Sequence, residues 1–502
     1  MIPRGWILSV LGAAALVIGA PLVLLAQRPT SVPPLVRFVE ATQDDERVSS
    51  AALREIAADW KDSYTAMFTD IARLMKAPRR STLDAPADAD GLAVDGDDSN
   101  DGARRPSNAL PNVPDRGSPI RRRLLTFLGK QTGKNFGDDL EKWQIWMWTL
   151  PYDPHPEYAT LKGLVYGKVD PRMQAFFPLG VKSTIRLDEI DWGGVTVNGI
   201  PPLRLPKTLP AAAARYLGDS NIVFGIVVNG EARAYPKRIL AWHEMAIDRI
   251  GGVDLTIVYC TLCGTVIPYE SAVGGRTMHF GTSGLLYQSN KLMFDEGTNS
   301  LWSTFEGTPV VGALVGSGLM LRTRPAVTTT WKEWRTTHPA TTVLSLDTGH
   351  RRDYSEGAAY RNYFASDQLM FQVSRTDNRL AKKAEVVVFK APGAAVRDPF
   401  TPVAIDAEFL RRHPVYSFTA GANRYTVVTS KGGANQVYQV NADIPEQSAS
   451  NTLRDRTGRQ WHVTETALVA GGAAAEPAPR VSAQRAFWFG WFAQFPSTLL
   501  IK

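Results

Sequence analysis

The stretch VDLTIVYCTLCGTVIPYE, residues 253–270, contains both cysteines of the 502-residue chain. Residues 255–259 alternate large apolar side chains with β-branched ones, a pattern typical of a half-buried strand. The residues after the second cysteine, GTVIPYE, have the composition of a further strand. Cys260 and Cys263 are therefore predicted to lie on a turn that ends a strand.

The composition indicates a folded protein with a substantial core. Hydrophobic residues make up 44% of the chain and aromatic residues 10%, and the length allows two or three domains. The formal net charge of +7 is modest, and no lysine- and arginine-rich run or aromatic-basic face is present in the sequence. We therefore expect no binding of nucleic acid.

An uncharged apolar segment lies near the N-terminus. Residues 5–26, GWILSVLGAAALVIGAPLVLLA, are long enough at about 1.5 Å per residue to cross a hydrocarbon core of about 30 Å. A cleaved signal peptide is the alternative, but Leu24 fits badly at the third position before a cut after Ala26. The sequence predicts a transmembrane anchor over residues 1–27, with the bulk of the chain outside the cytoplasm.

Three further segments precede the cysteine region. Apolar residues recur at three- and four-residue steps over residues 49–77, so residues 28–78 are predicted to form an amphipathic helical stalk, with packing on the main body as the alternative. Residues 79–119 are rich in Asp, Pro, Ala and Gly and are predicted to be a disordered linker. Residues 120–190 are predicted to be a helical lead-in with aromatic packing, from Trp143, Trp146 and Trp148.

The rest of the chain has the pattern of a β-rich fold. The segment IVFGIVVNGEARAYP predicts a hairpin whose turn is Asn229-Gly230, and a helix is predicted from Lys237 to about Ile247. The first β-rich module is assigned to residues 191–380 and the second to residues 381–502.

The two modules resemble each other. Residues 237–270 align without a gap with residues 407–440, at an offset of 170 (413 minus 243), and the apolar alternation is kept. His413 stands opposite His243, so a structural role for these histidines is an open alternative. The predicted fold class is α+β and β-rich, with two diverged copies of a strand-helix-strand-turn-strand module preceded by a transmembrane helix. The second copy contains no cysteine.

The spacing of the cysteines is compatible with a metal site. Two cysteines separated by two residues and followed by a glycine have the form of a zinc knuckle. His243 and His279 flank the pair in sequence, so Cys260, Cys263, His243 and His279 are the candidate ligands. Zinc and copper are the candidate metals, because soft thiolate ligands also select Cu(I). Haem attachment is excluded, since Gly264 stands where that motif requires histidine.

Two other functions fit the same residues. In a thiol-disulfide oxidoreductase Cys260 is the attacking nucleophile and Cys263 the resolving thiol, although the strand predicted after them offers no helix N-terminus to activate a thiol. In a non-catalytic envelope scaffold or binding protein the pair is a structural disulfide, which an oxidising compartment favours. The spacing of the cysteines does not distinguish these alternatives.

Four motifs carry a resemblance to a known family. The segments GEARAYPKRILAWHE, YCTLCGTVIPYE, FGTSGLLYQSNKLMFDEGTNSLWS and RAFWFGWFAQFPSTLLIK resemble, in this order, the bacterial family of unknown function DUF3179 over residues 190–502. The family commonly has proline where this chain has Thr261, a difference that keeps both thiols. The resemblance implies a secreted or membrane-anchored bacterial protein and no particular reaction. We therefore expect a single-pass protein of the bacterial cytoplasmic membrane, with its bulk facing the periplasm or the cell exterior.

Overall fold

The computed structural model of this chain describes residues 32–74, 119–395, 398–449, 452–471 and 476–502. The predicted membrane anchor, residues 1–27, lies outside these ranges, as does the predicted linker up to residue 118. None of the helices in the described ranges combines the length and the apolar character needed to cross a membrane.

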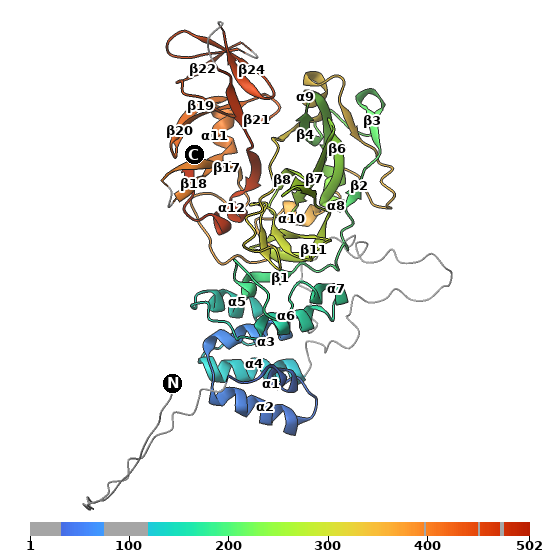
Figure 1. Cartoon of the computed structure of the whole chain (residues 1–502), viewed down its shortest axis with the longest axis vertical. Coiled ribbons are helices and arrows are strands. Elements are labelled where there is room, and N and C mark those ends of the chain that lie inside the picture. The colour runs from blue at the N-terminus through green and yellow to red at the C-terminus, as the bar shows by residue number, and fades with distance from the viewer. Residues whose placement is uncertain (1–31, 75–118, 396–397, 450–451, 472–475) are drawn as a thin grey trace, which may run out of the picture.

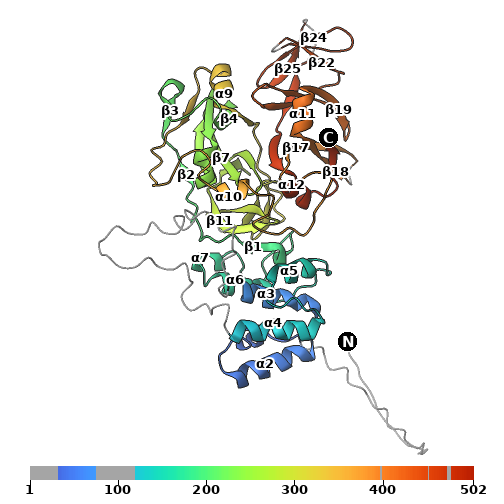
Figure 2. The ribbon, with the colours of Figure 1, turned by 180° about the vertical axis from the view of Figure 1, so that it is seen from behind.

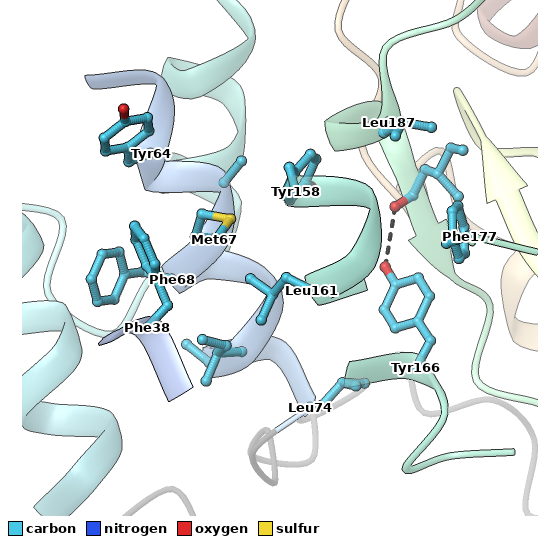
Figure 3. Packing of buried hydrophobic residues seen from close by; sticks show 14 of the residues in the cluster. Phe38, Tyr64, Met67, Phe68, Leu74, Tyr158, Leu161, Tyr166, Phe177 and Leu187 are labelled. Atoms are coloured by element: carbon cyan, nitrogen blue, oxygen red, sulfur yellow. Dashed lines mark hydrogen bonds between the residues drawn. The ribbon is translucent and has the colours of Figure 1, made fainter. Parts of the chain in front are cut away.

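The N-terminal part of the described chain is helical and lies at one end of the molecule (Figure 1). Its helices are α1 (Leu35–Glu40), α2 (Glu46–Ala58), α3 (Thr65–Leu74), α4 (Pro119–Thr132), α5 (Leu140–Trp148), α6 (Tyr158–Tyr166) and α7 (Pro171–Gln174), and 3-10 turns lie at Asp62–Tyr64 and Leu187–Glu189. Their apolar side chains form one core, part of which Figure 3 shows, and strands of the β-rich part contribute Leu285, Leu292 and Phe294 to it. The helices are therefore docked on the β-rich part through a shared core.

The segment predicted as a stalk packs into this core. One long helix is expected over residues 49–77, but the structure has two helices, α2 and α3, over residues 46–74. The chain leaves the helical conformation at Asp59 (φ −124°, ψ 39°). All but one of the ten residues of α3 are buried, whereas α2 buries a single face. Both helices therefore contribute to the core, α2 through one face and α3 through nearly all of its residues.

Buried polar contacts join the helices to the first strand, β1 (Ile190–Trp192). The Tyr166 hydroxyl donates a hydrogen bond of 3.2 Å to the Ile190 carbonyl (Figure 3). The Gln144 side-chain amide donates to both carboxylate oxygens of Asp191, at 2.9 and 3.0 Å, and Arg73 pairs with the same carboxylate. A buried carboxylate is tolerated only when it is paired in this way.

The first β-rich part follows. Its strands are β1, β2 (Leu203–Arg204), β3 (Thr208–Pro210), β4 (Ile222–Val228), β5 (Glu231–Pro236), β6 (Met245–Ile250), β7 (Val253–Cys260), β8 (Thr265–Glu270), β9 (Ala272–Val273), β10 (Arg276–Thr277), β11 (Phe280–Tyr287), β12 (Asn290–Asp295), β13 (Leu301–Ser303), β14 (Pro309–Val311), β15 (Val327–Thr330) and β16 (Thr342–Leu344). Its helices are α8 (Lys237–His243), α9 (Trp331–Thr337) and α10 (Arg361–Phe364), with a 3-10 turn at Ala211–Ala213. The strand orders in its sheets are β1-β11-β12-β13-β14, β15-β4-β5-β16-β3, β2-β6-β7-β8 and β10-β9.

The hairpin predicted around Asn229-Gly230 is confirmed. Val228 of β4 pairs with Glu231 of β5, and both turn residues have positive φ, 48° and 83°. This is the conformation that an Asn-Gly pair favours in a two-residue hairpin, because it matches the twist of the strands.

Helix α8 ends earlier than predicted. The sequence predicts helix to about Ile247, but Glu244 adopts a left-handed conformation (φ 53°), and β6 begins at Met245. The apolar residues that extend the helical pattern belong to β6, which pairs with β7 along its whole length. Sheet pairing therefore overrides the local helical preference.

The second β-rich part comprises β17 (Glu385–Ala395), β18 (Asp398–Asp406), α11 (Ala407–Arg412), β19 (Val415–Ala420), β20 (Asn423–Thr429), β21 (Asn435–Gln439), β22 (Glu446–Ala449), β23 (Thr452–Arg454), β24 (Gln460–Val463), β25 (Ala467–Ala470), β26 (Ala478–Val481), β27 (Gln484–Phe487), α12 (Trp488–Gln494) and β28 (Leu499–Ile501). Its strand orders are β27-β17-β18-β28 and β19-β20-β21-β26-β25-β24-β23-β22. Figures 1 and 2 show the two β-rich parts side by side, with α12 near their junction. The fold is α+β and β-rich, as the sequence predicts.

Candidate functional site

The cysteines lie on the turn between β7 and β8, as predicted. Cys260 is the last residue of β7 and pairs with Thr265, the first residue of β8. Gly264 closes the turn with φ 62°, and a Cβ added there would lie 3.0 Å from the Phe487 ring. Both the backbone conformation and the space therefore require glycine at this position.

Both cysteines carry free thiols and are buried, with 2% and 0% of their surface exposed. The C-terminal part of the chain covers them. The Phe487 amide donates a hydrogen bond of 2.7 Å to the Cys263 carbonyl, and a Cβ added to Gly490 of α12 would lie 2.9 Å from the Cys263 sulfur. The thiols are therefore at the junction of the two β-rich parts.

The two thiols are not equivalent. Burial by itself raises the pKa of a thiol, but a hydrogen bond from Cys263 and the backbone amides of Lys291 and Cys263 leave the pKa of Cys260 below its ordinary value. Burial and the neighbouring Cys260 raise the pKa of Cys263 well above its ordinary value. The Ser289 carbonyl, 3.3 Å from the Cys263 sulfur, is the alternative acceptor for the single proton of this thiol. Cys260 is therefore the thiol that ionises first, and Cys263 keeps its proton.

A buried ion pair lies beside the turn. The Lys291 ammonium is 2.5 Å from the Glu244 carboxylate, and each side chain is 7% exposed. The Tyr360 hydroxyl donates to the same carboxylate at 3.1 Å. Glu244 opposes ionisation of Cys260, whereas the amide of Lys291 favours it. Lys291 thus contacts both the carboxylate and the thiol.

The hairpin turn next to Cys263 is strained. Gln288 and Ser289 join β11 to β12 with φ of 50° and 59°, a conformation that costs a non-glycine residue about 1–2 kcal/mol. Ser374 holds the Gln288 side chain through two hydrogen bonds. The Gln288 side-chain NH2 donates to the Ser374 hydroxyl, and the Ser374 backbone N–H donates to the Gln288 side-chain carbonyl, both at 2.7 Å. Backbone strain of this kind is concentrated at functional sites.

Several buried hydroxyls around the turn have no hydrogen-bond partner within the described ranges. They are those of Thr261, Thr265 and Ser289. Buried polar groups are normally satisfied, so this group indicates a place where water or a polar ligand binds favourably.

A small pocket adjoins the thiol turn. Its volume is about 50 Å³, and Glu244, Leu262, Lys291 and Tyr360 contribute to its wall. Leu262 lies between the two cysteines in sequence, and the amide of Lys291 contacts Cys260. The pocket is therefore next to the turn that carries the thiols, although its lining residues do not include Cys260 or Cys263.

The two predicted histidine ligands are not grouped with the cysteines. The His243 ring is bonded on one side to the Pro201 carbonyl at 2.9 Å and on the other to the Tyr354 hydroxyl at 2.5 Å. His279 is exposed, between β10 and β11. Over the described part of the chain, no group of three or more His, Cys, Asp or Glu side chains is arranged to hold a metal ion.

Sequence reasoning did not identify Glu244, Lys291, Tyr360 or Gly490 as parts of the site. Three of them lie in the motifs quoted for the family resemblance, but separate motifs give no indication of which residues meet. Tyr360 lies outside those motifs, and no local pattern marks it.

The fold and site define an α+β protein with a buried, asymmetric dithiol at the junction of two β-rich parts. The chain belongs to the family described as protein of unknown function (DUF3179), whose model matches residues 197–498. No curated protein and no solved structure matches it.

Proposed function

We propose that Cys260 and Cys263 form a reversible dithiol-disulfide couple. The observation that carries the proposal is their placement: two free thiols in contact, at positions i and i+3 of one tight turn. Such a turn brings its end Cα atoms within about 7 Å, a separation that a disulfide can bridge.

The pair is suited to a two-electron reaction. The Cys260 thiolate and the Cys263 thiol together lose two electrons and one proton and form one S–S bond. The acceptor is an external disulfide or peroxide, which gains the two electrons and is released as thiols or as water and alcohol. The opposite pKa shifts of the two cysteines support this division of roles.

The test is redox titration of the full chain. The protein is equilibrated in buffers of graded dithiothreitol ratio, quenched with acid and alkylated, and the two-hydrogen mass difference of the disulfide is counted. We expect a single reversible two-electron transition, absent from Cys260→Ser and Cys263→Ser, and no unfolding on reduction. Absence of a disulfide under the most oxidising conditions would refute the couple, as would unfolding on reduction, which is the result that a structural disulfide predicts.

A zinc or copper site is the second candidate. Two adjacent buried thiols are ligands that Cu(I) accepts. Without a histidine beside them, however, a closed four-ligand zinc site lacks two ligands. Elemental analysis of reduced wild type against Cys260→Ser tests this candidate, which requires metal in the wild type alone.

We also propose that the protein works outside the cytoplasm, anchored by residues 1–27. The uncharged segment 5–26 supports this location. Alkaline extraction of membranes and protease treatment of intact cells test it, since an anchored outward-facing protein stays with the membrane and is digested.

We further propose that the two β-rich parts are diverged copies of one module. At the offset of 170 residues, α8 corresponds to α11 and β6-β7-β8 to β19-β20-β21. At a second offset of 157 (488 minus 331), β15-α9-β16 corresponds to β27-α12-β28. The central strand orders β15-β4-β5-β16 and β27-β17-β18-β28 support the same correspondence, including the parallel last pair in each.

The contacts between the parts are reciprocal. Gly490 of α12 lies against the Cys263 turn, and Gly432, in the corresponding turn of the second part, lies against Glu333 of α9. The module proposal requires the matched strands to superpose in an experimental structure of the protein, and a failure to superpose would refute it.

A further inference from the structure

The burial of the thiols limits which oxidants can reach them. Cys260 and Cys263 are 2% and 0% exposed, and α12 lies on the Cys263 side. Transfer of electrons to a protein disulfide requires the attacking sulfur to reach the sulfur of the partner directly. A thiol this deeply buried cannot do so without the turn leaving its place.

The pocket next to the thiol turn has room for a small molecule. Its volume of about 50 Å³ holds on the order of three or four water molecules. Its wall contains Leu262 from the thiol turn together with the Glu244–Lys291 ion pair. A molecule of a few atoms fits this space, whereas a molecule the size of glutathione disulfide does not.

The polar groups of the wall suit an oxidant that releases an anion. Lys291 is a buried cation that lines the pocket, and its own backbone amide contacts the Cys260 thiol. An oxygen that departs as hydroxide or alkoxide can take a proton from this ammonium. The unpartnered hydroxyls of Thr261 and Ser289 are further polar groups beside the cysteine turn.

We propose that the oxidant of the Cys260–Cys263 couple is a small hydroperoxide that enters through this pocket. The inference rests on the proposed dithiol-disulfide function and specifies its substrate class. The Cys260 thiolate attacks one peroxide oxygen, the O–O bond breaks, and Cys260 becomes a sulfenic acid while the departing oxygen is protonated to water or an alcohol. The Cys263 sulfur then attacks the sulfenic sulfur, the S–O bond breaks, and the disulfide forms with release of hydroxide, which takes up the Cys263 proton to give water.

The two reaction steps balance in electrons and in atoms. The peroxide gains two electrons, and the two cysteines lose two electrons in forming one S–S bond. A sulfenic acid formed on Cys260 has the Cys263 thiol on the same turn, and a neighbouring thiol converts a sulfenic acid to a disulfide.

The test is the rate of disulfide formation in the reduced full-length protein. Hydrogen peroxide, tert-butyl hydroperoxide and glutathione disulfide are compared at equal concentration, with acid quench and mass analysis. We expect hydrogen peroxide to react at least tenfold faster than glutathione disulfide, with tert-butyl hydroperoxide between them. Equal rates for hydrogen peroxide and glutathione disulfide would overturn the peroxide assignment and leave the redox couple standing, whereas failure of every oxidant would overturn both.

Variants of the pocket wall test the route itself. Val195 lines the pocket and is half-buried, so Val195→Trp is expected to lower the hydrogen peroxide rate at least tenfold. Met320 is 63% exposed, and Met320→Trp, the matched surface control, is expected to leave the rate unchanged. Leu262→Ala enlarges the pocket and is expected to raise the glutathione disulfide rate at least fivefold. If Val195→Trp does not fold, Leu262→Ala decides the question, because an unchanged glutathione disulfide rate in that variant contradicts the route.

Discussion

His243 is a fully buried imidazole that is hydrogen-bonded on both sides, and burial lowers its pKa to about 4. The unfolded chain takes up the proton near pH 6.5, whereas the folded protein does not do so until about pH 4. The stability associated with the neutral ring is therefore complete above pH 6.5 and is lost as the pH falls from 6.5 to 4. The full pKa shift of His243 corresponds to a loss of about 3 kcal/mol in the free energy of unfolding.

This predicts a steeper acid destabilisation in wild type than in His243→Gln. Urea unfolding at a series of pH values between 7 and 4 measures it. The comparison of variants is needed because burial also lowers the pKa of His155, which contributes in the same direction. Parallel stability profiles for the two proteins would show that His243 does not titrate as its surroundings indicate.

At the scale of elements, two hairpin turns allow a matched comparison. Ser289 has φ 59° and a buried hydroxyl without a partner, so Ser289→Gly is expected to raise the free energy of unfolding by up to about 1 kcal/mol. Gly230 has φ 83° and open space around it, so Gly230→Ala is expected to lower the same quantity by about 1 kcal/mol. Urea denaturation measures both, and a loss of stability in Ser289→Gly would contradict the strain assigned to this turn.

The local sequence pattern is sufficient to predict some of the elements. The Asn229-Gly230 hairpin and strand β7 follow from their own residues, because turn chemistry and alternation act over a few positions. The end of α8 and the break between α2 and α3 do not, because pairing with β7 and burial of α3 decide them. In both cases a distant part of the chain changes a local helical preference.

At the scale of the whole molecule, Asp191 joins the helical part to the β-rich part. It is buried, accepts from Gln144 and pairs with Arg73. Asp191→Ala leaves these groups without their partner, and we expect a loss of about 3–5 kcal/mol in the free energy of unfolding. Asp153, whose pair with Lys61 is solvent-exposed, provides the control, and Asp153→Ala should cost less than about 1 kcal/mol.

Chemical denaturation followed by tryptophan fluorescence and by far-UV circular dichroism measures both variants. The two signals should change together in the wild type, because the helices and the first sheet share one core. Equal stabilities of Asp191→Ala and Asp153→Ala would mean that the buried contact does not hold the two parts together.

The sequence by itself determined the strand, the turn and the contact of Cys260 with Cys263, because spacing along the chain sets geometry over a few residues. It also determined the α+β class and, through motifs in order, the family. Only the tertiary structure decided that α12 covers the thiols, that Glu244 and Lys291 pair beside them, and that His243 is bonded elsewhere. Burial, charge pairing and thiol acidity depend on residues far apart in sequence, and only the packing of the whole chain brings those residues together.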